Sequence, residues 1–235
     1  MIDALQVLRF SLADLWQDFG QLVLMNILWS LALFLPLVPL FVLTNVPLVW
    51  VLLLILLFWL PLPVISGALC FVTNQIARGK SVGWGTFGYG LRHYWAKSLV
   101  VWGINLVALV LFVSNLQFYG VVLEGTWTYF ALSAWLVLGI YWLLVQIFWF
   151  PMILELENER ILLALRNALT MVIITPVFSL SLGVLLLLIT VLSIVLTLPL
   201  LLFTASWMLL IFNHATRSRL AYVRKEPYQP GMDLD

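Results

Sequence analysis

Two histidines and a glycine-rich string are the residues whose types and spacing could do chemistry in this chain. His93 and His214 come from distant segments and make a poor metal centre, since a zinc site takes three or four ligands. Interfacial hydrogen bonding is their expected role, and axial ligation of a haem or chlorin is the alternative. The string GWGTFGYG at 83–90 contains G-x-G-x-x-G, but a dinucleotide site requires a strand before it and a helix N-terminus at the phosphate. Here it follows an apolar segment and holds three aromatic residues, so a flexible interfacial loop is favoured.

Ionisable side chains are missing from the long apolar segments. Catalysis or ion coupling within a membrane needs such groups inside the helix bundle, where they are costly to hold. We therefore predict no enzyme activity, no cofactor and no metal site. The uncharged stretches are 19–77, 98–123, 125–154 and 167–216.

The composition places most of the chain in lipid. Hydrophobic residues make up 64% of the sequence and charged residues 9%, whereas a soluble domain carries about 25% charged residues. The formal net charge of +1 gives no reason to expect nucleic-acid binding. A single cysteine, Cys70, excludes a disulfide within the chain and a cysteine metal cluster.

Stretches of this length predict an all-α, polytopic membrane protein with six transmembrane helices, because one span needs roughly 20 apolar residues. All Lys and Arg residues then fall on one side, so the positive-inside rule places both termini in the cytoplasm. Glu124 would be the lone charge outside. Residues 1–216 form one domain in this prediction, with spans at about 21–43, 48–72, 98–117, 127–151, 170–190 and 195–214.

Three stretches between the spans are expected at the cytoplasmic interface. Residues 1–20 have the leucine spacing of an amphipathic helix lying in the membrane plane. Residues 78–97 are expected to form a short, irregular segment, because Gly83, Gly85, Gly88 and Gly90 each weaken a helix by about 1 kcal/mol relative to Ala. Residues 155–168 are expected to form a second interfacial helix, and 217–235 a short polar tail. Pro61 and Pro63 predict kinks in the second span.

Few polar side chains lie within the predicted spans. Asn26, Asn105 and Gln146 are the main ones, and interhelical hydrogen bonding is their default role. The fourth span carries tryptophans at a spacing of seven, Trp135, Trp142 and Trp149. Packing is the favoured interpretation of this stripe, and stacking on a flat ligand such as a sugar ring or quinone is the alternative.

Three further motifs occur together in one known family. They are NILWSLALFLPLVP from Asn26, ARGKSVGWGTFGYGLRHYWAKS around Arg78-Gly79, and FWFPMILELENERILLALRNAL around Phe150-Pro151. With them the chain resembles the YesL-like bacterial integral membrane proteins, although the tryptophan-rich fourth span departs from the family. The resemblance implies a bacterial inner-membrane protein, and an accessory role beside carbohydrate ABC-transporter components. It provides no catalytic residues.

Three hypotheses for function follow. The first is a non-enzymatic accessory or scaffold protein that docks a membrane or cytoplasmic partner, such as a transporter component, on its cytoplasmic face. The second is a transporter or channel for a neutral small molecule, with a path lined by the three span amides. The third is a subunit of a pigment or redox complex. The candidate partner contacts of the first are Arg78, Lys80, Arg92, Arg160 and Arg166.

Overall fold

The computed structural model describes residues 3–42, 46–122 and 125–231. These residues are helical and contain no strand. The first half of the chain forms α1 (Ala4–Gln17), α2 (Phe19–Phe34), η1 (Leu35–Leu37), α3 (Val38–Val42), α4 (Leu48–Trp59) and α5 (Pro61–Ala77). The second half forms α6 (Trp84–Gln117), η2 (Phe118–Val122), α7 (Thr126–Glu155), α8 (Ile161–Ile174), α9 (Pro176–Leu196), η3 (Leu200–Thr204) and α10 (Ala205–Arg224). Glu124, the predicted external charge, lies outside the described residues.

Five helical segments are long and apolar enough to cross a membrane, as expected of a multi-pass helical membrane protein. The segment η3–α10, which contains most of the sixth predicted span of 195–214, is not one of them, because the second half of α10 is polar. The five segments are Phe19–Phe41, Leu48–Ala77, Trp84–Val121, Trp127–Glu155 and Pro176–Leu196.

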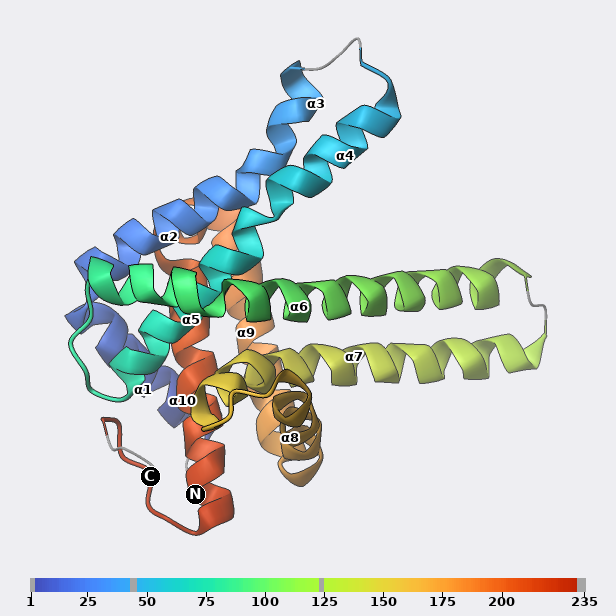
Figure 1. The fold of residues 1–235 in the computed structure, drawn as a ribbon. Helices are drawn as coiled ribbons and strands as arrows, with labels where there is room; N and C mark the ends of the chain where they lie inside the picture. The colour runs from blue at the N-terminus through green and yellow to red at the C-terminus, as the bar shows by residue number, and fades with distance from the viewer. Residues whose placement is uncertain (1–2, 43–45, 123–124, 232–235) are drawn as a thin grey trace.

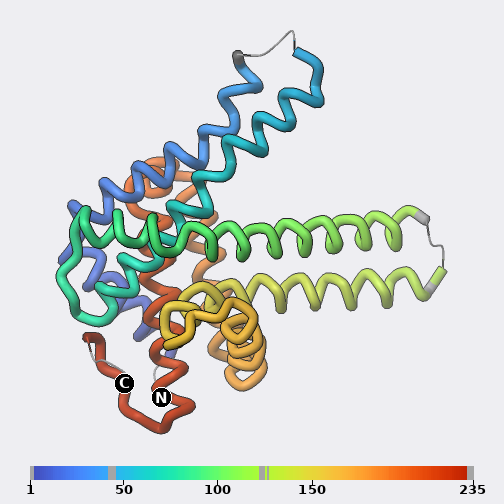
Figure 2. The backbone as a smooth tube through the Cα atoms, in the orientation of Figure 1, coloured from blue at the N-terminus to red at the C-terminus, as the bar shows by residue number. Residues whose placement is uncertain are grey.

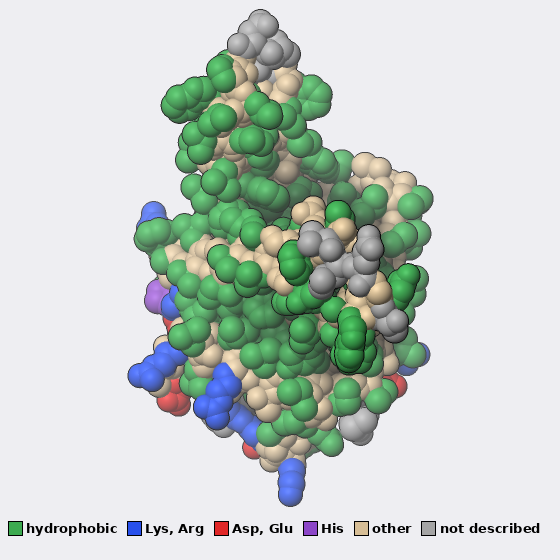
Figure 3. All heavy atoms as spheres, turned by 90° about the vertical axis from the view of Figure 1, so that its right-hand side faces the viewer, with side chains coloured by type: hydrophobic (Ala, Val, Ile, Leu, Met, Phe, Trp, Pro, Cys, Tyr) green, Lys and Arg blue, Asp and Glu red, His purple; other side chains and the backbone are tan. Residues whose placement is uncertain are grey.

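Two hairpins diverge from the body of the molecule (Figures 1 and 2). One is formed by α2, α3 and α4, and the other by α6 and α7, and their tips do not pack on each other. The sides of both hairpins expose large apolar residues, such as Leu53 at 51% and Val107 at 60%. Figure 3 shows the hairpin tips from outside, with hydrophobic side chains over the upper lobe and the charged side chains in the lower part and at the edges.

The charged side chains gather where α1, the start of α6, residues 155–166 and the second half of α10 lie, at the left and bottom of Figure 1. We call this region the charged end. The predicted amphipathic helix at 1–20 is confirmed as a helix, since α1 runs from Ala4 to Gln17 with Asp3 as its N-cap. It packs along α10, which lies about two hundred residues later in the chain. Trp207 of α10 packs against two buried hydrophobic clusters, one that contains Phe148 and Leu182 and one that contains Leu22 and Leu69.

The irregular segment expected over 78–97 is wrong for residues 84–97. These residues form the first half of α6, which continues without a break to Gln117. The glycines weaken the helix locally, but Gly90 also lets α5 and α6 approach closely. A Cβ atom on Gly90 would lie 3.1 Å from the Cα atom of Ala68, and Phe87 and Tyr94 are buried on the same helix. Tertiary packing therefore outweighs the low helix propensity.

The predicted boundaries after residue 150 also need correction. The helix expected at 155–168 begins only at Ile161, because α7 continues through Pro151 to Glu155. The fifth predicted span, 170–190, crosses a break at Thr175, where Pro176 starts α9. The tail expected from residue 217 is still part of α10, which ends at Arg224. The break predicted near Pro61 is confirmed, since α4 ends at Trp59 and α5 begins at Pro61. No second break occurs at Pro63, which lies in the first turn of α5.

Candidate functional site

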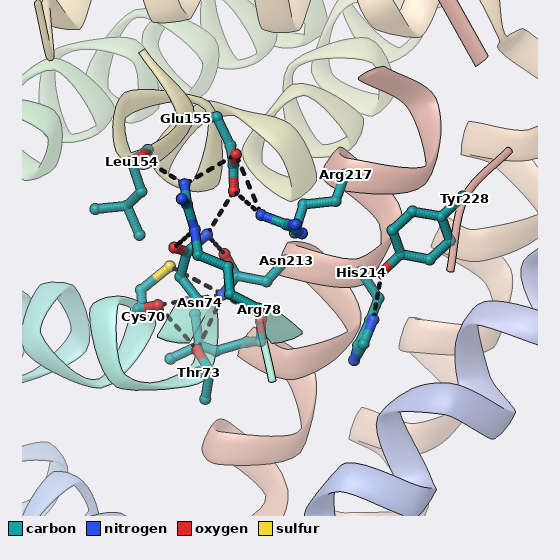
Figure 4. A network of polar contacts seen from close by, with 11 residues as sticks. Cys70, Thr73, Asn74, Arg78, Leu154, Glu155, Asn213, His214, Arg217 and Tyr228 are labelled. Atoms are coloured by element: carbon teal, nitrogen blue, oxygen red, sulfur yellow. Dashed lines mark hydrogen bonds and ion pairs between the residues drawn. The ribbon is translucent and has the colours of Figure 1, made fainter. Parts of the chain in front are cut away.

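A buried network of polar side chains joins α5, α7 and α10 at the charged end (Figure 4). Its centre is the Glu155 carboxylate at the end of α7, with only 6% of the side chain exposed. We call this cluster the Glu155 network. Its members are Thr73, Asn74, Arg78, Glu155, Asn213 and Arg217.

Two guanidinium groups share the Glu155 carboxylate. Arg78 Nη2 donates to Oε2 at 3.0 Å, and Arg217 Nη1 donates to Oε1 at 3.1 Å. The Arg217 side chain is fully buried, whereas 22% of the Arg78 side chain is exposed. Charge-assisted bonds of this kind are stronger than neutral ones, and a buried charge needs such partners. The pairing therefore ties the ends of three helices together.

Two asparagines connect the ion pairs to the helix backbones. Asn74 Nδ2 donates to Glu155 Oε1 at 2.8 Å and to Asn213 Oδ1 at 3.1 Å. Asn213 Nδ2 in turn lies 3.0 Å from Thr73 Oγ1 and 3.2 Å from the Cys70 carbonyl oxygen. Arg78 Nε donates to Asn74 Oδ1 at 3.0 Å. Such connected bonds fix one arrangement of the three helices.

A second chain of contacts begins one residue further along α10. His214 is fully buried, with its Nε2 atom 2.8 Å from Asp14 Oδ2 and its Nδ1 atom 2.7 Å from the Tyr228 hydroxyl (Figure 4 draws the second contact). An ionised carboxylate only accepts hydrogen bonds, so His214 Nε2–H donates to Asp14.

The order carboxylate, imidazole, hydroxyl is also that of an activated nucleophile. Burial, however, raises the pKa of Tyr228, so the phenol keeps its proton at neutral pH. A raised pKa makes the proton of the phenol harder to remove, which weakens Tyr228 as a nucleophile. The contact between His214 and Tyr228 holds the segment after α10 against α10. Further along this segment, Gly231 N–H donates to the carbonyl oxygen of Ala77, at the end of α5, at 3.2 Å.

Another anionic centre lies on the connection between α7 and α8. Glu159 accepts hydrogen bonds from Lys97, from Tyr94 at 2.8 Å and from His93 at 3.2 Å. Partial burial acts to raise the pKa of Glu159, but the three donors outweigh it and lower the pKa below its ordinary value. Glu159 has a backbone φ of 45°, unusual for a residue other than glycine. These contacts hold the connection against α6.

The five predicted partner contacts do not form one patch. Arg78 belongs to the Glu155 network, whereas the other four are exposed. Arg160 and Arg166 line a groove beside α8. Lys80 lines a different hollow with Asp14 and Asp18, and Arg92 lies on α6.

The three predicted span amides divide between two places. Asn26 Nδ2 donates to the carbonyl oxygens of Leu200 and Leu201 at 3.0 and 2.8 Å, and its Oδ1 accepts from Ser206 N–H at 3.0 Å. These are backbone groups in and after the π-helical turn η3. The predicted role in hydrogen bonding is confirmed for this residue, because it satisfies backbone groups where the helix is irregular.

Asn105 and Gln146 form the other pair. Asn105 Nδ2 donates to Gln146 Oε1 at 3.1 Å, and Trp142 Nε1 donates to Asn105 Oδ1 at 3.0 Å. Trp142 also packs edge-on against Trp149, which is fully buried. The predicted tryptophan stripe therefore makes packing contacts within the chain, without testing the alternative of a flat ligand.

Two hollows lie beside the Asn105–Gln146 pair, and Asn26 lines neither. One, of about 400 Å³, lies between α6 and α7 among apolar residues such as Phe112 and Trp135. The other, of about 270 Å³, is lined by residues of α5, α6, α7 and α10, among them Cys70 and Ser98.

Comparisons with protein-family models, curated proteins and solved structures found no match. The resemblance to the YesL-like family therefore stays a prediction. Within the described residues, no group of three or more His, Cys, Asp or Glu side chains is arranged to hold a metal ion.

The sequence analysis missed the residues at the centre of the network, Glu155, Asn74, Asn213 and Arg217. One signal was present in the sequence. Asn213 and Arg217 are four residues apart, which places two polar side chains on one face of a helix that follows an apolar segment.

Proposed function

We propose that this chain is a non-enzymatic accessory or scaffold protein of a bacterial inner membrane. In this proposal it crosses the membrane six times, with about residues 195–214 as the sixth span and both termini in the cytoplasm. The charged end then faces the cytoplasm and receives a protein partner. The resemblance to the YesL-like family suggests a component of a carbohydrate ABC transporter as that partner.

One observation carries the proposal. The three span amides are used by the chain's own hydrogen bonds, since Asn26 bonds to η3 and Asn105 bonds to Gln146. They therefore support the helices, while exposed charges such as Arg92 and Glu157 gather at the charged end. Helix ends that are held in place and carry exposed charges are better suited to binding a protein partner than to catalysing a reaction.

Site-specific cross-linking in native membranes tests the docking surface. A photo-reactive residue replaces Arg92 at the charged end, and a matched variant carries it in place of Leu53, which is exposed on the side of α4. We expect one reproducible protein adduct from position 92 and none from position 53. Recovery of free monomer alone from both variants would contradict the proposal.

Cysteine labelling tests the orientation. In a Cys70→Ser background, Val121→Cys at the hairpin tip should react with a membrane-impermeant maleimide added to intact cells. Arg92→Cys should react only after the cells are opened. The opposite pattern would reverse the proposed orientation.

A transporter or channel for a neutral solute remains the second candidate. The 270 Å³ hollow favours it, because Cys70, Asn105 and Gln146 give this hollow polar groups beside the helix break at Leu60. A water-filled path through it would expose Cys70 to small thiol reagents in the membrane. We expect Cys70 to stay unmodified, and rapid modification would favour the transporter.

The third candidate, a subunit of a pigment or redox complex, has less support. Both ring nitrogens of His214 already have hydrogen-bond partners, and His93 Nε2 faces Glu159. Axial ligation by His214 would require the loss of one of these contacts. Co-purification of the protein with a cofactor that absorbs visible light would favour this candidate.

A further inference from the structure

An open groove of about 830 Å³ runs between α6 and the start of α8. Lys97 and the apolar residues Val100 and Ile104 form its α6 side. Residues 158–163 and Arg166 form the opposite side. The groove is separate from the Glu155 network and from the hollow that contains Cys70.

One end of the groove is basic. Arg160 and Arg166 are exposed, and no carboxylate of the described residues lies within ion-pair distance of either guanidinium group. Lys97 is paired with Glu159, the only acid on the groove lining. Three bases thus face one acid whose charge is already matched.

The start of α8 adds to this positive end. Arg160 is its N-cap residue, and no side chain caps the first turn. The first N–H groups of a helix lack partners within the helix and carry its positive dipole. The uncapped turn at Ile161–Leu163 lies on the groove lining beside Arg160, so backbone and side chains both favour an anion there.

The rest of the groove is apolar and is open to the side. Val100 and Ile104 follow Lys97 along α6, about 5 and 10 Å further from the charged end at 1.5 Å per residue. Val100 is 48% exposed and Leu162 is 73% exposed. Basic groups at the interface followed by an apolar wall match the two halves of a phospholipid.

We propose that this groove binds an anionic phospholipid. The phosphate lies against Arg160, Arg166 and the first turn of α8, and one acyl chain lies along Val100 and Ile104. A soluble anion would leave the apolar wall uncovered, and a zwitterionic lipid would leave the excess positive charge unmatched. Basic pockets beside membrane helices bind anionic headgroups by the same chemistry.

Lipid binding to the purified full-length protein tests the proposal. Fluorescent phosphatidylglycerol is titrated against the wild type and against the double variant Arg160→Gln/Arg166→Gln in detergent. We expect binding about thirty-fold weaker in the variant, the factor corresponding to ~2 kcal/mol for two bases at an anionic surface. The control Arg9→Gln/Lys225→Gln removes two exposed bases outside the groove and should bind like the wild type.

Competition identifies the ligand without any substitution. Unlabelled phosphatidylglycerol should displace the probe from the wild type, whereas phosphatidylcholine and inorganic phosphate at the same concentration should not. Displacement by inorganic phosphate would indicate a free-anion site, and equal displacement by phosphatidylcholine would indicate general lipid contact. Equal loss in the control variant would indicate surface charge alone, and any of these three results would overturn the proposal.

Discussion

Replacing Glu155 by glutamine is the sharpest test of the buried network. The substitution keeps the size of the side chain but removes the charge that Arg78 and Arg217 share. The amide group can accept through one oxygen only, and its NH2 group would face a guanidinium donor. Both guanidinium groups would then lose the carboxylate that they share.

The expected loss follows from the burial of the three side chains. Removing one partner of a buried ion pair costs about 3–5 kcal/mol, because the other charge stays buried without compensation. Arg217 is fully buried, but 22% of the Arg78 side chain reaches solvent and can be hydrated. We therefore expect Glu155→Gln to lower the free energy of unfolding by about 3 kcal/mol, at the lower end of that range.

Reversible unfolding in mixed micelles, followed by the helical circular dichroism signal, measures this loss. Glu157→Gln is the matched control, since Glu157 is exposed and lies two residues away. The control should change stability by less than about 0.5 kcal/mol, as surface substitutions usually do. Equal stability of the two variants would refute the view that the Glu155 network holds the helix ends together.

Three further predictions concern the packing and the charges around this network. Asn26→Leu should lower the free energy of unfolding by about 1–3 kcal/mol, because it leaves buried backbone groups at η3 without partners; wild-type stability in the same micelle assay would contradict this. Gly90→Ala should destabilise, since its Cβ would lie 3.1 Å from the Ala68 Cα atom, whereas Gly88→Ala meets nothing within 4 Å and should be neutral or stabilising by up to about 1 kcal/mol. Thermal unfolding of the two variants side by side decides this, and an identical shift would refute the close approach of α5 and α6. The lowered pKa of Glu159 contributes stability that is present above its unfolded value of 4.5 and is lost as the pH falls through the lower folded value. The free energy of unfolding should therefore decrease less steeply from pH 7 to pH 3 for Glu159→Gln than for the wild type. Parallel curves for the two proteins would contradict the contacts assigned to Glu159.

Much of the fold could be predicted from hydropathy and charge, because the composition of each segment indicates whether that segment suits lipid or water. The amphipathic pattern at 1–20 gave α1, and Pro61 marked the break between α4 and α5. The prediction for 84–97 was wrong because glycine propensity is also a local quantity. Whether a glycine weakens a helix or permits close packing depends on the neighbour that faces it, and the neighbour of Gly90 is Ala68 on α5.

The candidate site could not be found in the same way. Arg217 follows the last apolar segment and has the local pattern of an exposed tail, yet it is fully buried. Its partner Glu155 lies 62 residues earlier, at the end of another helix. Local sequence shows that a charge is present but does not show which distant charge will neutralise it.

The sequence by itself determined that this chain is helical, that it has several segments long and apolar enough to cross a membrane, and that its charges avoid these segments. Composition and charge spacing suffice for this, because a bilayer excludes charge and demands internal backbone hydrogen bonds. Only the tertiary structure decided which charges are buried as pairs and which stay exposed. That distinction depends on contacts between α5, α7 and α10, where desolvation is offset only when the partners meet at hydrogen-bond distance.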